Sequence, residues 1–364
     1  MFDVSRRRGM MSVVLTDLCL RRFRCFDSLE FQPGAGRTFI VGRNAQGKTS
    51  ILEAACILLR LQSPRTTSLA EAVKFAQPGF DLDGHCAGSH LSCRYSGGSR
   101  EIALDSKPQS RTDDYLDVAR VGWFANSDLD LVRGSGSVRR RYLDFLGVQS
   151  VPGYRKSLRA YEKALRSRNS LLKDSRPRRE IAAFDEPLIE AGEALISART
   201  ELCCQLAPLA RGACSEISGG AEILESAYRP GCAEPFREAL SGSRAEEERL
   251  RQTVVGPHRD DVGLVIGGLD ASTFASEGQQ RSIALALKIA QARHLEAVQG
   301  RPPVLLLDDV FGELDTVRRN LLLDALPSGA QSIISTTFLD WVGDSGGDSV
   351  FHLSEGLLSA QRRD

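Results

Sequence analysis

Apolar residues recur along the chain with periods that predict a mixed α/β fold. The N-terminal part predicts short strands at 12–16 and 29–31, an apolar strand at 39–41, a Gly-containing loop, and a helix whose apolar residues are spaced by three or four. Residues 80–118 are rich in Gly, Ser and Asp and contain two stretches of polar–apolar alternation. These stretches predict an antiparallel β portion.

The pattern becomes helical from Tyr154 to about Leu209. Two runs with apolar residues on one face flank a charged linker, so we expect two helices packed as a hairpin, each too short for a long coiled-coil arm. The rest of the chain predicts a charged helix at 234–252, a β-like stretch at 253–268, a helix from about 276, an apolar strand within 302–309, a helix at 316–326 and a strand at 332–337.

The composition is that of a folded, soluble protein. Of 364 residues, 42% are hydrophobic. No apolar run approaches the roughly 18 residues of a membrane span, and no signal peptide is recognisable, so we expect a soluble cytoplasmic protein without a membrane partner. The nine cysteines are scattered without a Cys-x-x-Cys pair, which predicts free thiols rather than disulfides or a zinc site.

The net charge and its distribution limit the ways in which the chain could bind nucleic acid. The formal net charge is zero, which argues against coating nucleic acid by bulk charge. Only seven of 47 cations are lysines; arginine suits bidentate phosphate contacts, although a GC-rich genome gives the same bias. Arg139, Arg140 and Arg141 form a local cluster, which we interpret either as a DNA contact or as residues flanking a helix.

A phosphate-binding loop is the strongest motif. It satisfies G-x-x-x-x-G-K-[ST] in full and lies between a predicted strand and a predicted helix, as the motif requires. In such a loop the backbone N–H groups cradle phosphates, the lysine reaches the β- and γ-phosphates, and the hydroxyl binds Mg²⁺. The predicted ATP-binding residues are Gly42, Arg43, Asn44, Ala45, Gln46, Gly47, Lys48 and Thr49, with Thr49 as a metal ligand.

Two carboxylates end the apolar strand at 304–309. A strand buried in a parallel sheet delivers its terminal side chains next to the phosphate loop. We expect Asp308 to hold Mg²⁺, directly or through water, and Asp309 to orient and polarise the attacking water. A simple acidic turn after a core strand is the alternative.

The stretch Ser276-Glu277-Gly278-Gln279-Gln280 opens a helix with an awkward glycine. Ser276 and Gln279 have the spacing of a capping box, which alone would explain them. The alternative is that Gly278 lets an external anion approach the N–H groups and positive dipole of the helix. Residues 276–280 alone do not decide between the two.

The order of these motifs resembles the ATP-binding-cassette ATPases, in which a signature helix precedes the second acidic strand. Several segments narrow the resemblance to the RecF family of bacterial recombination mediators, within the SMC-like ATPases. They are 20–31, 131–146, 161–173, 256–261, 276–282 and 305–315, and they span nearly the whole chain from about residue 12.

The resemblance implies an α/β ABC-type ATPase head, with a P-loop core and an antiparallel β portion, plus an inserted helical lobe. We expect the ATPase lobe at 12–150 and 253–364, and the helical lobe, with a short hairpin, at 151–252. Residues 1–11 are expected to be a disordered tail or a mis-called start.

The resemblance also implies function. A homodimer would form around ATP and Mg²⁺, bind single-stranded, gapped or junction DNA, and hydrolyse ATP slowly, as a switch, in recombinational repair, replication restart and the SOS response. A RecR-type mediator is the implied partner. Across the dimer, Ser276, Gly278 and Gln279 would contact the other subunit's nucleotide, and Asp315, after Glu313 and Leu314, would belong to the loop crossing the interface.

Several positions depart from the family pattern. Ala45 replaces a glycine, so nucleotide affinity is expected to be weaker if that position needs a positive φ. Asp309 stands where many cassette relatives have glutamate, which predicts slow hydrolysis. Thr336 and Thr337 occupy the place of a histidine switch, and Thr337 is the expected sensor. Asn126-Ser127-Asp128 lacks the usual glutamate, which leaves that residue's role in doubt.

Three further side chains invite a functional interpretation. Arg24 and Arg65 are candidates for nucleotide or DNA contacts, with simple solvated arginines as the alternative. For His258 a structural role is expected, since Asp309 already serves as general base. The alternative functions are an ATPase subunit of an ABC transporter, and an SMC-type structural head.

Overall fold

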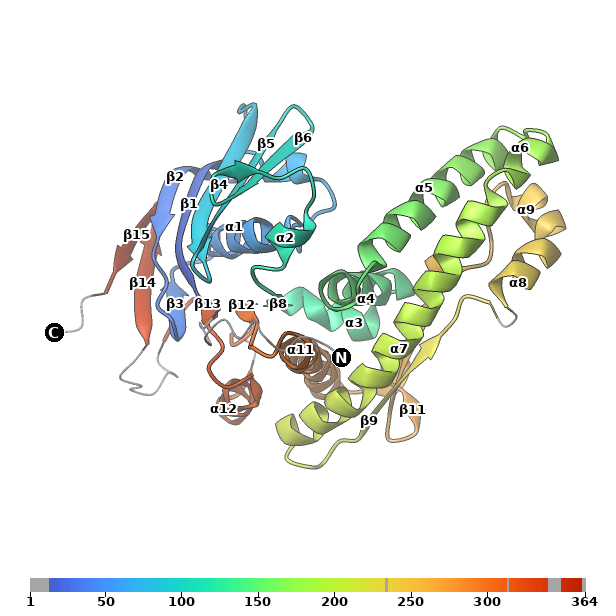
Figure 1. Cartoon of the computed structure of the whole chain (residues 1–364). Helices are drawn as coiled ribbons and strands as arrows, with labels where there is room; N and C mark the ends of the chain where they lie inside the picture. The colour runs from blue at the N-terminus through green and yellow to red at the C-terminus, as the bar shows by residue number, and fades with distance from the viewer. Residues whose placement is uncertain (1–12, 233–234, 313, 340–347, 362–364) are drawn as a thin grey trace, which may run out of the picture. The chain divides into compact units, whose positions relative to one another are not determined.

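The computed structural model describes residues 13–232, 235–312, 314–339 and 348–361. The chain divides into two compact units (Figure 1): one joins residues up to Asn126 with those from Leu295 onward, and the other spans Ser127–His294. The predicted tail or start at 1–11 lies outside the described residues. No helix in the described ranges is both long and apolar enough to cross a bilayer.

A mixed six-stranded sheet forms the centre of the first unit. Its order is β15-β14-β3-β13-β12-β8, and only β15 runs antiparallel to its neighbour. Its inner strands are apolar and buried, as expected for a parallel sheet covered on both faces. The strands are β3 (Arg37–Val41), β8 (Val121–Ala125), β12 (Val304–Asp308), β13 (Ser332–Thr336), β14 (Ser349–Ser354) and β15 (Leu357–Ala360); α12 (Thr316–Ala325) connects β12 to β13.

An antiparallel sheet of order β2-β1-β4-β5-β6-β7 completes this unit. Helix α1 (Lys48–Arg60) is buried almost all round because it contacts strands of both sheets. The strands are β1 (Leu15–Phe23), β2 (Phe26–Phe31), β4 (Gly79–Cys86), β5 (Ser89–Ser96), β6 (Ser99–Leu104) and β7 (Lys107–Pro108); the short helices are η1 (Leu69–Ala72) and α2 (Asp113–Leu116).

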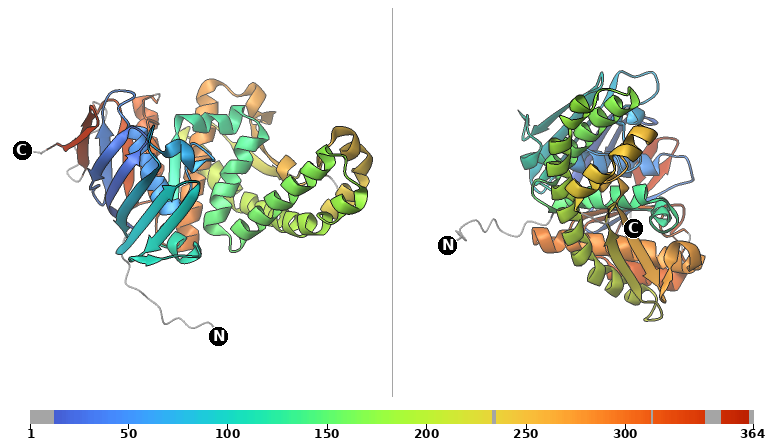
Figure 2. Two further views of the ribbon diagram at one scale, coloured as in Figure 1. Left: turned by 90° about the horizontal axis from the view of Figure 1, so that it is seen from above. Right: turned by 90° about the vertical axis from the view of Figure 1, so that its right-hand side faces the viewer.

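A helical hairpin dominates the second unit, where α5 and α7 pack along each other (Figure 2). A three-stranded sheet of order β11-β10-β9 packs with α4 and α7. The elements are η2 (Asn126–Leu129), α3 (Asp130–Arg133), α4 (Gly136–Ser150), α5 (Tyr154–Lys173), α6 (Arg178–Ala182), α7 (Asp185–Ile217), β9 (Leu224–Arg229), α8 (Phe236–Gly242), α9 (Arg244–Leu250), η3 (Pro257–Arg259), β10 (Asp261–Ile266), β11 (Leu269–Asp270), α10 (Ala271–Phe274) and most of α11 (Glu277–Gln299).

The boundaries of the units differ from the predicted lobes. Helix α4 and strand β10, both predicted within the ATPase lobe, belong to the second unit. Strand β10 pairs with β9 along six residues, and α4 packs on β10, α5 and α7. The second unit therefore extends beyond 151–252 on both sides and includes the signature stretch.

Three elements depart from the predicted pattern. Helix α7 continues to Ile217, past an exposed Pro208, because buried Ala210, Ala213 and Cys214 extend its apolar face. The charged helix predicted at 234–252 is two short helices that meet at Ser243. In the β-like stretch at 253–268, only β10 is a strand of more than two residues.

Candidate nucleotide-binding site

The phosphate loop runs from the end of β3 to the start of α1, as predicted. Gly47 has φ +104°, and a Cβ at this position would lie 2.6 Å from Phe26 Cζ and 2.8 Å from Cys25 Sγ, so no larger residue fits. Ala45 has φ +63°. The position where the family usually has glycine therefore does require a left-handed backbone, which costs alanine about 1 kcal/mol.

The Lys48 ammonium group is folded onto its own loop. Its Nζ donates to the backbone oxygens of Gly42 at 2.6 Å and Arg43 at 3.0 Å. Burial lowers the pKa of Lys48, while the nearby carboxylates of Asp309 and Asp308 act in the opposite direction. Two carbonyl groups of the phosphate loop thus hold the Lys48 ammonium group in the absence of nucleotide.

Asp308 and Thr49 come together as the motif requires. Thr49 Oγ1 donates to Asp308 Oδ1 at 2.8 Å, and Ser335 Oγ on the neighbouring strand β13 donates to the same oxygen, also at 2.8 Å. Ser335 was missed in the sequence. Strand β13 also contains the buried hydroxyl residues Ser332 and Thr336, so the sequence alone does not single out Ser335.

The next residue, Asp309, has a left-handed backbone conformation. Its φ is +53°, and its N–H points at Ser335, donating to the side-chain oxygen at 3.0 Å and the backbone oxygen at 3.2 Å. Asp and Asn tolerate this conformation better than Glu. Backbone geometry therefore favours aspartate over glutamate at position 309, independently of the shorter side chain of aspartate.

The residues at this edge fit a magnesium ion. Thr49 and Asp308 offer a hydroxyl and a carboxylate oxygen, which are the hard ligands that Mg²⁺ prefers, and Mg²⁺ takes its other ligands from water and phosphate. Among the described residues no cluster of three or more His, Cys, Asp and Glu is arranged to hold a metal. A Mg²⁺ site that is completed by nucleotide oxygens does not need such a cluster of protein ligands.

The remaining loop residues and the sensor position surround the same edge. Arg43 and Asn44 are exposed, and Gln46 Oε1 accepts from the N–H of Glu355 at 2.7 Å. The N–H of Gly42 donates to the oxygen of Thr336 at 3.2 Å, which places the end of β13 beside the phosphate loop. Thr337 is half-buried at the bend that follows.

Both halves of the predicted capping box form at the start of α11. The N–H of Ser276 donates to Gln279 Oε1 at 2.9 Å, and the N–H of Gln279 donates to Ser276 Oγ at 3.3 Å. Ser276 is exposed and Gly278 is half-exposed. The capping interpretation is therefore confirmed, and the serine still faces solvent.

The turn is braced from α3. Arg133 Nε donates to Gln280 Oε1 at 2.5 Å, while Gln280 Nε2 donates to the oxygen of Ala275 at 3.1 Å. Glu277 pairs with Arg281 at 3.1 Å. These contacts keep the exposed end of the helix in one conformation.

Asp315 has a local structural role. It is the N-cap of α12, where its Oδ1 accepts from the N–H of Arg318 at 2.9 Å, and it is exposed. Glu313, the first residue of the predicted interface loop, lies outside the described residues. The interface role of Asp315 stays a prediction.

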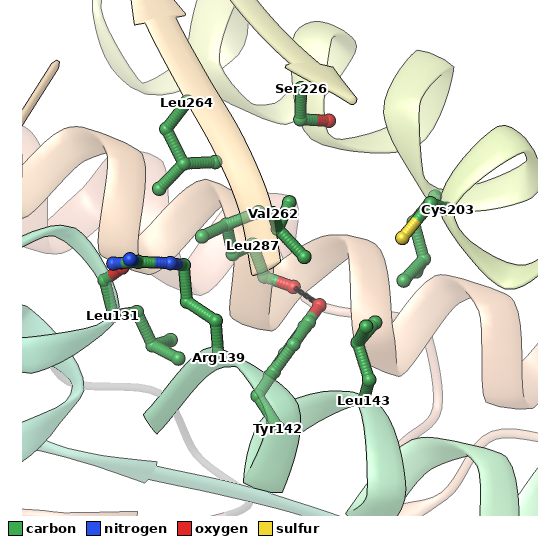
Figure 3. Close-up of a pocket in the computed structure, with 10 residues that line it drawn as sticks. Leu131, Arg139, Tyr142, Leu143, Cys203, Ser226, Val262, Leu264 and Leu287 are labelled. Atoms are coloured by element: carbon green, nitrogen blue, oxygen red, sulfur yellow. Dashed lines mark hydrogen bonds between the residues drawn. The ribbon is translucent and has the colours of Figure 1, made fainter. Parts of the chain in front are cut away.

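Two of the three clustered arginines have internal roles. Arg139 binds both carboxylate oxygens of Asp261, at 2.6 and 2.9 Å, and lines a small apolar pocket (Figure 3). Arg140 donates to the oxygen of Asp260 at 2.6 Å, and burial lowers its pKa. For Arg139 and Arg140 these contacts favour the alternative interpretation, a structural role in a helix, and DNA contact by the cluster stays a prediction. Arg141 alone is exposed and remains a candidate.

The 256–261 segment is a structural junction within the second unit. Arg199 is buried and donates to Asp144 and Asp260, each at 2.8 Å. Burial alone would lower its pKa, but Asp144 and Tyr154 outweigh that effect and raise it. His258 Nδ1 lies 2.7 Å from the hydroxyl of Tyr161, and Nε2 lies 3.0 Å from the oxygen of Thr253. Burial lowers the pKa of His258, which supports the expected structural role.

A buried carboxylate that the sequence analysis missed organises Arg24 and Arg65. Glu53 on α1 is fully buried and accepts from Arg24 at 2.7 and 2.9 Å, from Arg65 at 3.0 Å, and from Ser63 Oγ at 2.6 Å. Both arginines are thus held one turn of helix beyond the phosphate loop. Glu53 lies on the side of α1 opposite to its apolar positions, so periodicity alone predicts an exposed residue there.

Comparison with known proteins agrees with this geometry. A family model described as an AAA domain matches residues 18–88. A DNA replication and repair protein RecF from Anaeromyxobacter sp. is 39% identical, over 94% of this chain and 97% of its own. The chain belongs to the RecF family. A RecF from Synechocystis sp. is 37% identical, over 91% of this chain and 93% of its own.

Solved structures agree with the RecF assignment. A structure described as the recombination mediator protein RecF-ATP in the RecFOR pathway has a TM-score of 0.87 and 29% identity, over 98% of this chain and all of that one. The Smc head domain of Pyrococcus furiosus, at 14% identity and a TM-score of 0.55, shares the fold alone. The predicted ABC-type ATPase head is confirmed.

Proposed function

We propose that this RecF family member is an ATP-controlled DNA-binding dimer that acts in recombinational repair and replication restart, including gap repair and the SOS response. Its substrates are single-stranded, linear and gapped duplex DNA, and a RecR-type mediator is its partner. The relatives named as DNA replication and repair proteins, and the RecF-ATP structure, support this proposal over a transporter subunit.

One observation carries the proposal: the hydrogen bond between Thr49 and Asp308 beside the cradled Lys48. It assembles the lysine, hydroxyl and carboxylate that a Mg²⁺–ATP complex needs. Bound Mg²⁺ supplies charge neutralisation of the phosphates. Asp309 orients the attacking water, and Thr337 senses the γ-phosphate from the end of β13.

The exposed signature supports dimerisation. Ser276 is ordered by its capping box and faces solvent, so it is available to a second copy. In the dimer, Ser276, Gly278 and Gln279 of one subunit contact the γ-phosphate held by Lys48 of the other, and Asp315 lies in the loop at the interface. ATP then stabilises the dimer by binding it more tightly than the monomer, and slow hydrolysis releases it.

Titration with a fluorescent ATP analogue tests nucleotide binding. Lys48→Met is expected to abolish it, whereas Lys156→Met, at an exposed site on α5, is the matched control and should bind like the unaltered protein. Tight binding by Lys48→Met would show that the phosphate loop is misassigned.

A further inference from the structure

Phe75 is 94% exposed at the tip of a tight turn, residues 74–77, which we call the Phe75 turn. The N–H of Gln77 donates to the oxygen of Lys74 at 3.1 Å, and Ala76 has φ +61°. An alanine in this conformation is strained, and an aromatic ring in water forgoes the free energy of burial.

The turn is fixed to the end of the β1–β2 hairpin. The N–H of Lys74 donates to the oxygen of Arg22 at 2.9 Å, and the N–H of Arg24 donates to the oxygen of Ala72 at 2.8 Å. The Lys74 ammonium pairs with Asp27 at 2.6 Å. The ring is therefore presented on a rigid base.

The hairpin end that holds this turn carries Arg22 and Arg24, each of which belongs to a pair of arginines around one buried carboxylate. Arg22 and Arg94 share the single carboxylate of Asp81. Arg24 and Arg65 likewise share the single carboxylate of Glu53. Each of the two buried carboxylates thus meets two guanidinium groups, and Asp83 and Glu101 act on Arg94 in addition.

Parts of both clusters reach solvent. The side chain of Arg94 is 66% exposed and that of Arg65 is 44% exposed, whereas Asp81 and Glu53 are largely or fully buried. An anion from outside therefore meets the guanidinium groups of Arg94 and Arg65 before Asp81 or Glu53, and the exposed carboxylate of Asp27 is paired with Lys74. A rigid, exposed aromatic ring on a hairpin end that also carries arginine clusters is a combination that suits single-stranded nucleic acid, with bases stacked on the ring and phosphates on the cations.

We propose that the Phe75 turn is a contact site for single-stranded DNA, in which an unpaired base stacks on Phe75 and the flanking phosphates meet the two arginine clusters. The inference rests on the proposed DNA binding and adds where on the ATPase unit the unpaired strand lies. A protein partner fits less well, because the exposed neighbours Ala76, Gln77 and Pro78 offer small or polar surface rather than a broad apolar patch.

Fluorescence anisotropy of the full-length protein with ATP, on a labelled single strand, a gapped duplex and a blunt duplex, tests the inference. Phe75→Ala should weaken binding to the single strand and the gapped duplex by about 5- to 150-fold, the effect of losing one base–aromatic stack, and leave the blunt duplex unchanged. Phe75→Trp should retain the affinity. Leu357→Ala, at another exposed apolar site of the same unit, is the control.

The outcomes separate the inference from the proposed function. If the unaltered protein binds none of the DNAs, the proposed function fails. If it binds them and Phe75→Ala binds equally well, or loses affinity for all three DNAs alike, only the Phe75 site is overturned. Loss of ATP-dependent dimers by Phe75→Ala with DNA affinity unchanged would make the turn a protein contact, and would also overturn it.

Discussion

Thr49 Oγ1 donates a 2.8 Å hydrogen bond to Asp308 Oδ1 across 259 positions of sequence. Asp308→Asn keeps an oxygen that accepts this bond but removes the negative charge. We therefore expect the variant to fold normally and to lose the Mg²⁺ dependence of ATP binding. The ratio of its ATP affinity in Mg²⁺ buffer to its ATP affinity in chelator buffer should fall at least about tenfold. Titration in both buffers measures the ratio, and an unchanged ratio would exclude Asp308 as a metal ligand.

Asp309 is expected to act in hydrolysis and not in binding. Asparagine tolerates its positive φ, so Asp309→Asn should keep the backbone and ATP affinity while slowing phosphate release by about 10²- to 10⁴-fold. Asp324→Asn, at an exposed site on α12, is the matched control. Hydrolysis at the normal rate by Asp309→Asn would remove the residue from the mechanism.

Ala45→Gly tests whether the phosphate loop stores strain. The positive φ of Ala45 is present without nucleotide, so relieving it should raise the free energy of unfolding by about 1 kcal/mol or less. Since the strain is then the same with and without ATP, we expect nearly unchanged ATP affinity, in place of the weaker affinity expected from the sequence. Ala160→Gly, on an exposed helical position of α5, should lower stability by a similar amount. Thermal melts measure both variants, and we expect a higher melting temperature for Ala45→Gly and a lower one for Ala160→Gly. A lower melting temperature for Ala45→Gly would contradict the strain.

His258 should make stability depend on pH. Because burial lowers its folded pKa below 6.5, the unfolded chain takes up the proton more readily, so the stability that neutral His258 contributes is present above pH 6.5 and is lost as pH falls below it. His258→Gln should therefore lose less melting temperature than the unaltered protein between pH 7 and pH 5. His294, whose pKa burial also lowers, is present in both proteins. Parallel curves would show that His258 does not titrate in this range.

Local patterns predicted the elements that bear the nucleotide site. The glycine loop, its strand and its helix were correctly placed because motif and periodicity agree there, and Ser276 with Gln279 formed the expected capping box. Helix α7 continues past Pro208 because its apolar face extends to Ile217. Packing of this face outweighs the helix-breaking tendency of the exposed proline.

Contacts between residues far apart in the sequence could not be predicted from the local pattern of apolar and polar residues. Arg139 looked like a surface cation, but its partner Asp261 lies 122 positions away. Ser335 and Glu53 act through residues from other segments, so their polar character was visible but their partners were not. The unit boundaries shifted for the same reason, since β10 pairs with β9 from the predicted insertion.

ATP-dependent pairing of two subunits through Ser276 is the central claim, and sedimentation velocity on gapped duplex DNA, with and without ATP, tests it most directly. We predict that ATP converts the unaltered protein from monomer to dimer on the DNA. Ser276→Arg should stay monomeric while still binding ATP, and Ser241→Arg, at an exposed site on α8, should dimerise normally. Equal dimer formation by Ser276→Arg, or no effect of ATP on the unaltered protein, would contradict the account.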